Sequence, residues 1–324
     1  MKAIVYDRYG PPGVLQYQEI EKPTPADDQV LIQVRASSAN PYDWHFIRGT
    51  PSFIRLFTGI RAPKSHRLGS DVAGVVEAVG RNVTGLKPGD AVFGTAAGSF
   101  AEYVCASSSS LALKPENLTW EQAASAPIAG ITALQGLRDK GKIQAGQRIL
   151  INGAAGGVGT FAVQIARSYG AHVTAVCSTR NIELVRSLGA DVVIDYTREN
   201  YTQETQRYDL LFDLVGNNPL SASLRALHPK GTYIGCGGGG PDRRSLELLG
   251  SMLHTVVLAP FVSQKMPGLF AKVNTADLTF LADLMRDGKV TPVLDRTYAL
   301  KETAGAIGYL EQCHARGKVA ITVP

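Results

Sequence analysis

A glycine-rich segment in the middle of the sequence has the residue types of a phosphate-binding turn. Residues 149–159 (ILINGAAGGVG) place glycines between a short apolar run and GTFAVQIARSYG, an amphipathic segment. Glycines at a strand-to-helix turn let backbone N–H groups approach a pyrophosphate at the helix N-terminus. On the G-x-G-x-x-G pattern the positions are Ala154, Gly156 and Gly159, so alanine replaces the first glycine. The stretch predicts a dinucleotide site formed by Gly153, Ala155, Gly156, Gly157, Val158 and Gly159; the alternative is a turn needed only for folding.

The residues that follow the next two predicted strands indicate which dinucleotide binds. Residues 176–181 (VCSTRN) contain no Asp or Glu, although NAD sites use such an acid to bind the ribose 2′-hydroxyl. Ser178 offers a hydroxyl, Arg180 a guanidinium and Tyr196 a phenol, and these groups suit a 2′-phosphate. One hydrogen bond to a charged group contributes roughly 1.5–3 kcal/mol, or about a tenfold preference. NADPH is the predicted cofactor; the alternative is that Arg180 only caps the following helix.

The elements that must position these residues alternate between short apolar strands and amphipathic helices from Arg148 onward. This alternation predicts a parallel, doubly wound sheet, and so an α/β fold class. Ligands bind beyond the carboxyl ends of such strands. Two strand ends, DLVG and IGCGGGG, therefore predict further cofactor contacts at Val215, Gly216, Cys236 and Gly237, with Cys236 a neutral spacer rather than a nucleophile.

The two ends of the sequence differ from the middle in their predicted secondary structure. The first third reads as short strands separated by Gly, Pro and Asp, and the closing segments resemble it, which predicts one β-rich domain built from both ends. Thr119 and Gln122 form a capping-box pattern that opens a helix leading into the middle. We expect the outer domain over residues 1–122 and 268–324 and the dinucleotide-binding domain over residues 123–267, with the active site in the cleft between them.

The amino-acid composition and the net charge indicate what kind of protein this is. The 324 residues are 44% hydrophobic and 19% charged, a globular composition with length for about two domains. The four cysteines form no CxxC pair, which fits reduced thiols. The start of the sequence lacks a signal-peptide pattern, and no apolar run approaches about 18 residues, so we expect a cytoplasmic protein without membrane insertion. A formal net charge of +5, spread along the sequence, requires no nucleic acid as a partner.

Motifs along the whole sequence resemble those of the zinc-independent quinone oxidoreductases in the medium-chain dehydrogenase/reductase superfamily. The motifs are ANPYDWHFIRG, GSDVAGVVEAVG, LKPGDAVFG, AGITALQGL, ILINGAAGGVG, LVRSLGADVVIDY and ARGKVAITV. The resemblance implies a discontinuous GroES-like catalytic domain plus a Rossmann domain. It also implies a homodimer joined through an outer strand of the Rossmann sheet, which residues 254–260 (HTVVLAP) would supply.

The resemblance also locates the positions at which zinc-containing relatives carry their ligands. These positions fall within residues 40–43 (NPYD) and 69–71 (GSD), and the thiolate and imidazole ligands of a tetrahedral zinc site are missing at both. We therefore expect no metal. Quinones and α,β-unsaturated carbonyls are conjugated and electrophilic, so hydride reduction needs less help from a Lewis acid than reduction of a simple ketone.

By the same resemblance, Asn40 and the turn after it flank the nicotinamide, and Thr132 contacts the cofactor. Tyr42 and His45 then lie near the substrate. An imidazole or an ordered water at His45 would donate a proton or a hydrogen bond to the substrate oxygen; the alternative is that His45 points to solvent. Arg316 and Lys318 are further candidates to reach the cofactor.

The predicted function is NADPH-dependent, zinc-independent hydride transfer to a quinone or an activated enone. Two alternatives stay open: a 2-alkenal or enoyl reductase, and a non-catalytic protein that binds NADPH or RNA.

Overall fold

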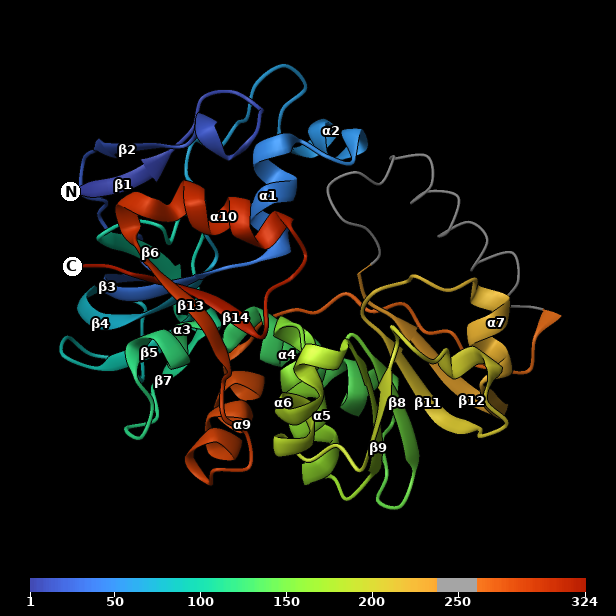
Figure 1. The fold of residues 1–324 in the computed structure, drawn as a ribbon. Coiled ribbons are helices and arrows are strands. Elements are labelled where there is room, and N and C mark those ends of the chain that lie inside the picture. The colour runs from blue at the N-terminus through green and yellow to red at the C-terminus, as the bar shows by residue number, and fades with distance from the viewer. Residues whose placement is uncertain (238–260) are drawn as a thin grey trace. The chain divides into compact units, whose positions relative to one another are not determined.

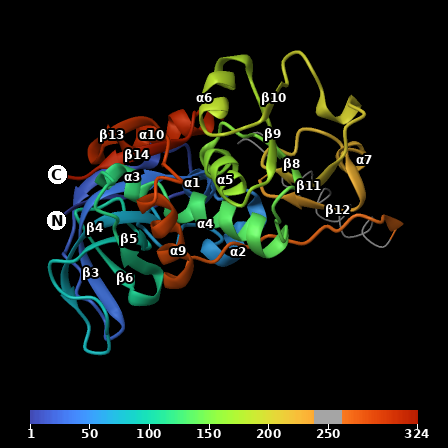
Figure 2. The ribbon, with the colours of Figure 1, turned by 90° about the horizontal axis from the view of Figure 1, so that it is seen from below.

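The structure, a computed structural model, describes residues 1–237 and 261–324 (Figure 1). The chain divides into two compact units. Unit 1 comprises Met1–Ile131, Lys272–Gly288 and Pro292–Pro324, and unit 2 comprises Thr132–Ala271 and Lys289–Thr291. Both ends of the chain belong to unit 1 and lie on the same side of it in Figures 1 and 2. The predicted dimer strand, residues 254–260, lies outside the described residues.

Unit 2 is built on a parallel sheet of five strands within the described residues, in the order β10-β9-β8-β11-β12. The strands are β8 (Arg148–Asn152), β9 (His172–Cys177), β10 (Val192–Asp195), β11 (Tyr208–Asp213) and β12 (Leu227–Gly235). The strand order reverses between β8 and β11, which is the switch point where open α/β sheets bind ligands. The predicted doubly wound parallel sheet is confirmed.

Helices cover this sheet, so its central strands are buried. Side chains 149–152 of β8 are all buried, as expected for a parallel strand with both faces covered. Helix α5 packs on β8 and β9, α6 on β9 and β10, and α7 on β12 (Figures 1 and 2). The helices are α5 (Gly157–Ser168), α6 (Ile182–Ser187) and α7 (Leu220–Arg225), and a π-helical turn spans Gly136–Lys140.

Unit 1 contains a mostly antiparallel sheet in the order β13-β14-β3-β4-β5-β7, with β6 paired to β3 as well. Strands β1 (Lys2–Val5) and β2 (Gln16–Glu19) form a separate hairpin pair. The sheet strands are β3 (Gln29–Ala39), β4 (Asp71–Val79), β5 (Ala91–Thr95), β6 (Tyr103–Ser107), β7 (Leu111–Leu113), β13 (Leu294–Ala299) and β14 (Lys318–Thr322). Because β14 pairs with β3, the last strand of the chain lies beside an early one.

The helices of unit 1 are short. They are α1 (Pro41–Arg48), α2 (Arg55–Thr58), α3 (Trp120–Ala124), α9 (Thr275–Arg286) and α10 (Thr303–Glu311), and α4 (Pro127–Gln135) runs across the boundary between the units. Helices α3, α9 and α10 pack against this sheet, whereas α1 packs on α10. Short 3-10 turns occur in unit 1 at Pro12–Val14, Ser52–Ile54, Ser108–Ser110 and Leu300–Glu302, and in unit 2 at Thr179–Asn181 and Tyr201–Gln203.

The predicted capping box is confirmed at the start of α3. The Thr119 hydroxyl accepts a hydrogen bond from the backbone N–H of Gln122, whose side chain accepts one from the backbone N–H of Thr119. Among the described residues, no helix combines the length and the apolar character needed to cross a membrane.

Candidate functional site

The glycine-rich turn of unit 2 joins the carboxyl end of β8 to α5. Its left-handed residue is Gly153, with φ of +87°, one position before the pattern residue Ala154. The N–H groups of both residues donate to the carbonyl oxygen of Val176 in β9, at 3.2 and 3.1 Å. The tight turn is thus made by Gly153, which explains why alanine is tolerated at the first position of the pattern.

The third pattern glycine permits the close approach of helix and turn. A Cβ atom on Gly159 would lie 2.2 Å from the carbonyl oxygen of Gly153 and 2.7 Å from the backbone of Ala154. A Cβ atom on Gly156 would lie 3.4 Å from the same oxygen, its one neighbour within 4 Å. Packing within the protein therefore requires glycine at position 159, whereas the space beside Gly156 is open.

The start of α5 has the features of an anion site. Gly156 is its N-cap, so no side chain caps the first N–H groups, and the first turn carries no acidic residue. The N-terminal N–H groups of a helix, together with its dipole, favour a phosphate. The turn and α5 therefore fit the pyrophosphate of a dinucleotide.

A buried carboxylate, Asp213, organises the neighbouring strand ends. Its Oδ1 atom accepts hydrogen bonds from the Asn152 side chain at 2.9 Å and from the N–H groups of Val215 and Gly216 at 3.1 and 2.8 Å. Its Oδ2 atom accepts one from the Tyr233 hydroxyl at 3.0 Å. The ends of β8, β11 and β12 are thereby joined at the switch point, and the predicted contact residues Val215 and Gly216 are held in one turn.

The sequence interpretation did not single out Asp213, Asn152 or Tyr233. Burial, and secondarily the nearby Asp213 carboxylate, raises the pKa of Tyr233, so its hydroxyl stays protonated as a donor. Burial also raises the pKa of Cys236 to about 11. A neutral thiol supports the spacer role for Cys236, which lies just before Gly237, a residue with φ of +105°.

The predicted 2′-phosphate residues lie at the carboxyl ends of the paired strands β9 and β10. Tyr196 is 56% exposed, Arg180 is exposed, and the Ser178 hydroxyl accepts a hydrogen bond from the Asn181 side chain at 3.1 Å. Exposed groups at these strand ends are accessible to a ligand, so their placement is compatible with a 2′-phosphate.

An acid also lies at this edge of the sheet, on β10 rather than β9. Asp195 accepts hydrogen bonds from the Thr179 hydroxyl at 2.5 Å and from the N–H and hydroxyl of Thr197 at 3.0 and 2.8 Å. The bond from Thr179 is the main cause that lowers the pKa of Asp195. This carboxylate is thus engaged by the protein's own hydroxyl groups.

In unit 1, Asn40 follows strand β3 and is the N-cap residue of α1. Its side chain is 3% exposed. The amide oxygen accepts a hydrogen bond from Lys318 Nζ at 2.5 Å, and the amide nitrogen donates to Asp71 Oδ2 at 2.9 Å. The carboxylate of Asp71 also accepts from the Ser38 hydroxyl at 2.6 Å, and Lys318 Nζ lies 3.4 Å from it. We call Ser38, Asn40, Asp71 and Lys318 the Asp71 cluster.

The Asp71 cluster was only partly visible in the sequence. The sequence predicts Asn40 and Lys318 as candidates for cofactor contact, and it indicates residues 69–71 (GSD) only as a stretch that lacks metal ligands. The structure joins all of them, and the Lys318 ammonium contacts Asn40 and Asp71 of unit 1. Adjacent strand pairing of β14, β3 and β4 brings these distant residues together.

Asp43, in the first turn of α1, is a second buried carboxylate. Its Oδ2 atom accepts the N–H of Asn40 at 2.8 Å, whereas its Oδ1 atom is buried without a hydrogen-bond partner among the described residues. Burial, aided by the nearby Asp71 charge, raises the pKa of Asp43 to about 7. The turn after Asn40 therefore contains a carboxyl group that titrates near neutral pH.

The aromatic residues of α1 divide into exposed and packed side chains. Tyr42 is 49% exposed and its ring lies 4.1 Å from that of Phe46, whereas Trp44 is buried and stacks on the His45 ring at 3.7 Å. Tyr42 is therefore accessible to a ligand, and Trp44 is a packing residue.

His45 has a defined tautomer. Its Nδ1 atom lies 2.7 Å from the carbonyl oxygen of Thr50, which can only accept, so Nδ1 carries a proton. Burial lowers the pKa of His45 despite this hydrogen bond, so the ring is neutral at pH 7 and Nε2 holds a lone pair. The neutral ring can accept a hydrogen bond at Nε2, and this geometry does not favour proton donation by His45 itself.

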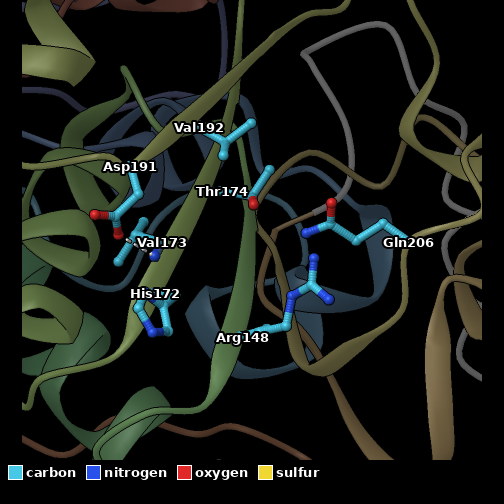
Figure 3. Close-up of a pocket in the computed structure, with 7 residues that line it drawn as sticks. All are labelled: Arg148, His172, Val173, Thr174, Asp191, Val192 and Gln206. Atoms are coloured by element: carbon cyan, nitrogen blue, oxygen red, sulfur yellow. Dashed lines mark hydrogen bonds between the residues drawn. The ribbon is translucent and has the colours of Figure 1, made fainter.

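A pocket in unit 2 lies at the opposite ends of the strands from the glycine-rich turn. It is lined by residues from the starts of β8, β9 and β10, with Asp191 accepting the N–H of Val173 at 2.8 Å (Figure 3). Ligands of open α/β sheets bind at the carboxyl ends of the strands. This pocket is therefore separate from the candidate dinucleotide site. Its lining residues are Arg148, His172, Val173, Thr174, Asp191, Val192 and Gln206.

Comparison with known proteins identifies the family. Residues 26–116 match the alcohol dehydrogenase GroES-like domain, and residues 188–321 match a family described as zinc-binding dehydrogenase. The NADPH-dependent alkenal/one oxidoreductase, chloroplastic, of Arabidopsis thaliana is 36% identical over 338 residues, which cover 99% of this chain and 79% of that protein. The chain belongs to the medium-chain dehydrogenase/reductase superfamily, in its quinone oxidoreductase group.

Two further relatives agree with this membership. The quinone oxidoreductase of Sus scrofa is 32% identical over 98% of this chain and 95% of that protein. The quinone oxidoreductase structure from Coxiella burnetii has a TM-score of 0.85 at 32% identity, and the match covers 100% of this chain and 99% of that one. The resemblance inferred from the motifs is confirmed. This superfamily member is an NAD(P)H-dependent oxidoreductase similar to quinone and alkenal reductases, with a Rossmann fold and a GroES-like domain.

The residues of the Asp71 cluster do not fit the zinc ion that one family description mentions. Zinc sites use thiolate, imidazole and carboxylate ligands. Here the amide of Asn40 and the carboxylate of Asp71 are already hydrogen-bonded, and a fixed ammonium lies against both. Within residues 1–237 and 261–324, no group of three or more His, Cys, Asp or Glu side chains is arranged to hold a metal ion.

Replacement of Gly159 by alanine should weaken NAD(P)H binding at least about tenfold, a loss of about 1.4 kcal/mol. The new Cβ atom would overlap the Gly153 carbonyl and force α5 away from the turn. The dissociation constant is measured by nucleotide fluorescence. Gly308→Ala in α10 is the matched control, because its Cβ atom would meet only Pro12 Cγ, at 4.0 Å. A folded Gly159→Ala protein with unchanged affinity would contradict the role of the turn.

Replacement of Asp43 by asparagine should change how stability depends on pH. An acid whose pKa is raised on folding binds more protons in the folded state, so its contribution to stability is lost as pH rises. For Asp43 this loss falls between about pH 4 and pH 7. The free energy of unfolding of Asp43→Asn, relative to wild type, should increase across that range in urea denaturation.

The exposed residue Asp7 provides the control, because Asp7→Asn removes a surface carboxylate from the same unit. A stability difference between Asp43→Asn and wild type that stays flat across this range would show that Asp43 remains ionised in the folded protein.

Proposed function

We propose that this chain reduces quinones or activated α,β-unsaturated carbonyls with NADPH and without zinc. The observation that carries the proposal is the Asp71 cluster, where a lysine ammonium contacts Asn40 and Asp71. These residues belong to the two stretches, 40–43 and 69–71, in which the motif resemblance places the ligand positions of zinc-containing relatives. Conjugated acceptors spread the negative charge that develops on reduction, so they need less Lewis-acid assistance than simple ketones. The names of the relatives include both quinone and alkenal reductases.

In this proposal, unit 2 binds the dinucleotide. Ala155, Gly157, Val158 and Gly159 bind the pyrophosphate through backbone N–H groups at the start of α5. Gly153 and Gly156 contact it as the residues that shape the turn, because their own N–H groups donate to Val176 and Gly153. Ser178, Arg180 and Tyr196 bind the 2′-phosphate, and Thr132, Val215, Gly216, Cys236 and Gly237 line the rest of the cofactor. NADPH supplies hydride when bound.

In this proposal, the turn of unit 1 that begins at Asn40 orients the acceptor for hydride transfer. Tyr42 provides an exposed aromatic wall suited to a flat substrate. His45 Nε2 accepts a hydrogen bond from an ordered water, and that water donates to the substrate oxygen as negative charge develops there. This arrangement keeps His45 neutral, in agreement with its lowered pKa. The cytoplasmic location, the homodimer and the lack of a nucleic-acid partner stay predictions.

The proposed reaction is tested by following nicotinamide absorbance with chelator-treated protein. A simple quinone and a short-chain enone are offered separately, each with NADPH and with NADH. We expect oxidation of NADPH by at least one acceptor, undiminished by the chelator. Activity that is lost on chelation and restored by zinc would overturn the zinc-independent mechanism, and NADPH binding without turnover of either acceptor would overturn the proposed substrate class.

The preference for NADPH should depend on Arg180. In Arg180→Gln, the KM for NADPH should rise about tenfold, as expected for loss of one charged hydrogen bond, while the KM for NADH changes little. Arg186→Gln is the matched control, because Arg186 is an exposed arginine of α6 paired with Glu183. Equal changes in both KM values for Arg180→Gln would contradict a 2′-phosphate contact.

A further inference from the structure

The orientation of the Asn40 side-chain amide is fixed by a hydrogen-bond donor, Lys318, and a hydrogen-bond acceptor, Asp71. Lysine can only donate hydrogen bonds and an ionised carboxylate can only accept them. Lys318 Nζ donates to the amide oxygen at 2.5 Å, and the amide nitrogen donates to Asp71 Oδ2 at 2.9 Å and to the Ser38 carbonyl at 3.3 Å. A rotation of the amide by 180° would place its NH₂ against the ammonium and its oxygen against the carboxylate. Only one orientation is therefore compatible with the cluster.

Asp71 also accepts a hydrogen bond from the backbone of helix α4. Its Oδ1 atom accepts the backbone N–H of Ile128 at 2.9 Å, in the first turn of α4. This helix also contains Thr132, another predicted cofactor contact. The beginning of α4 and the Asn40 turn thus share one carboxylate.

The charge of Lys318 balances this buried carboxylate. The side chains of Lys318 and Asp71 are 4% and 0% exposed. An ionised carboxylate buried to this degree is costly unless it is paired and hydrogen-bonded. Lys318 supplies the positive charge that pairs with the Asp71 carboxylate in this buried cluster.

We propose that Lys318 is a positioning residue for hydride transfer, a built-in cation that orients the Asn40 amide and, through Asp71, the start of α4. The proposal deepens the proposed function and rests on it for the effect on turnover. The orientation of Asn40 itself can be tested without any turnover.

The decisive variant is Lys318→Met combined with Asp71→Asn. Lys318→Met alone leaves a buried charge unpaired and is expected to fold poorly. The double variant removes both charges, so we expect it to fold. It also removes the donor to the Asn40 oxygen. We expect kcat to fall about tenfold or more, while the dissociation constant for NADPH changes less than about threefold, because the pyrophosphate contacts are untouched.

Lys318→Arg is the rescue variant, because a guanidinium keeps both the charge and the donors. Its kcat should stay above that of the double variant. Lys87→Met, at an exposed lysine of the same unit, is the control for loss of a lysine.

Proton exchange of the Asn40 side-chain amide, followed by nuclear magnetic resonance on ¹⁵N-labelled protein, gives the independent measurement. We expect slow exchange in wild type and Lys318→Arg, and fast exchange in the double variant. Slow exchange in the double variant, or a kcat equal to wild type, would overturn the positioning role. If wild type turns over neither acceptor, the proposed function fails, and the exchange measurement still decides whether Lys318 orients Asn40.

Discussion

A carboxylate taken out of water must be paired and hydrogen-bonded, and this constraint governs unit 1 at Asp71. Its two oxygens accept from a hydroxyl, an amide and a backbone N–H, with an ammonium completing the set. The donors come from the end of β3, the start of α4 and the start of β14. Removal of one partner from such a buried pair typically costs about 3–5 kcal/mol. The Asn40 side chain is thus held by a buried carboxylate and a buried ammonium that come from two other strands, β4 and β14.

Unit 2 also contains a buried, hydrogen-bonded carboxylate at its strand ends. Asp213 lies where the strand order reverses, and its oxygens accept from Asn152, Tyr233 and the turn that follows β11. In both units, a buried acid at a strand end fixes the backbone of an adjoining loop. Backbone groups fixed in this way need no reorganisation when a ligand arrives, which is the condition for electrostatic preorganisation.

The features that could be predicted from the sequence are those encoded by neighbouring residues. The glycine-rich turn, the parallel strands of unit 2 and the capping box at Thr119 each depend on signals within about a dozen positions. The Asp71 cluster could not be predicted, because Lys318 and Asn40 are 278 positions apart and their contact depends on strand order. The tautomer of His45 likewise depends on the Thr50 carbonyl, whose direction is set by the folded turn. The roles of individual residues toward ligands stay predictions.

The place of β14 in the chain has a consequence for biosynthesis. During translation the Asn40 turn is synthesised first, then all of unit 2, and Lys318 only after it. Domains generally fold as units during translation, and contacts between distant segments form late. A nascent chain can therefore complete its nucleotide fold while Asp71 still lacks its counter-ion. The Asp71 cluster is thus completed only after β14 has been synthesised, so a chain interrupted before β14 could contain a folded unit 2 and an Asp71 carboxylate without its ammonium partner.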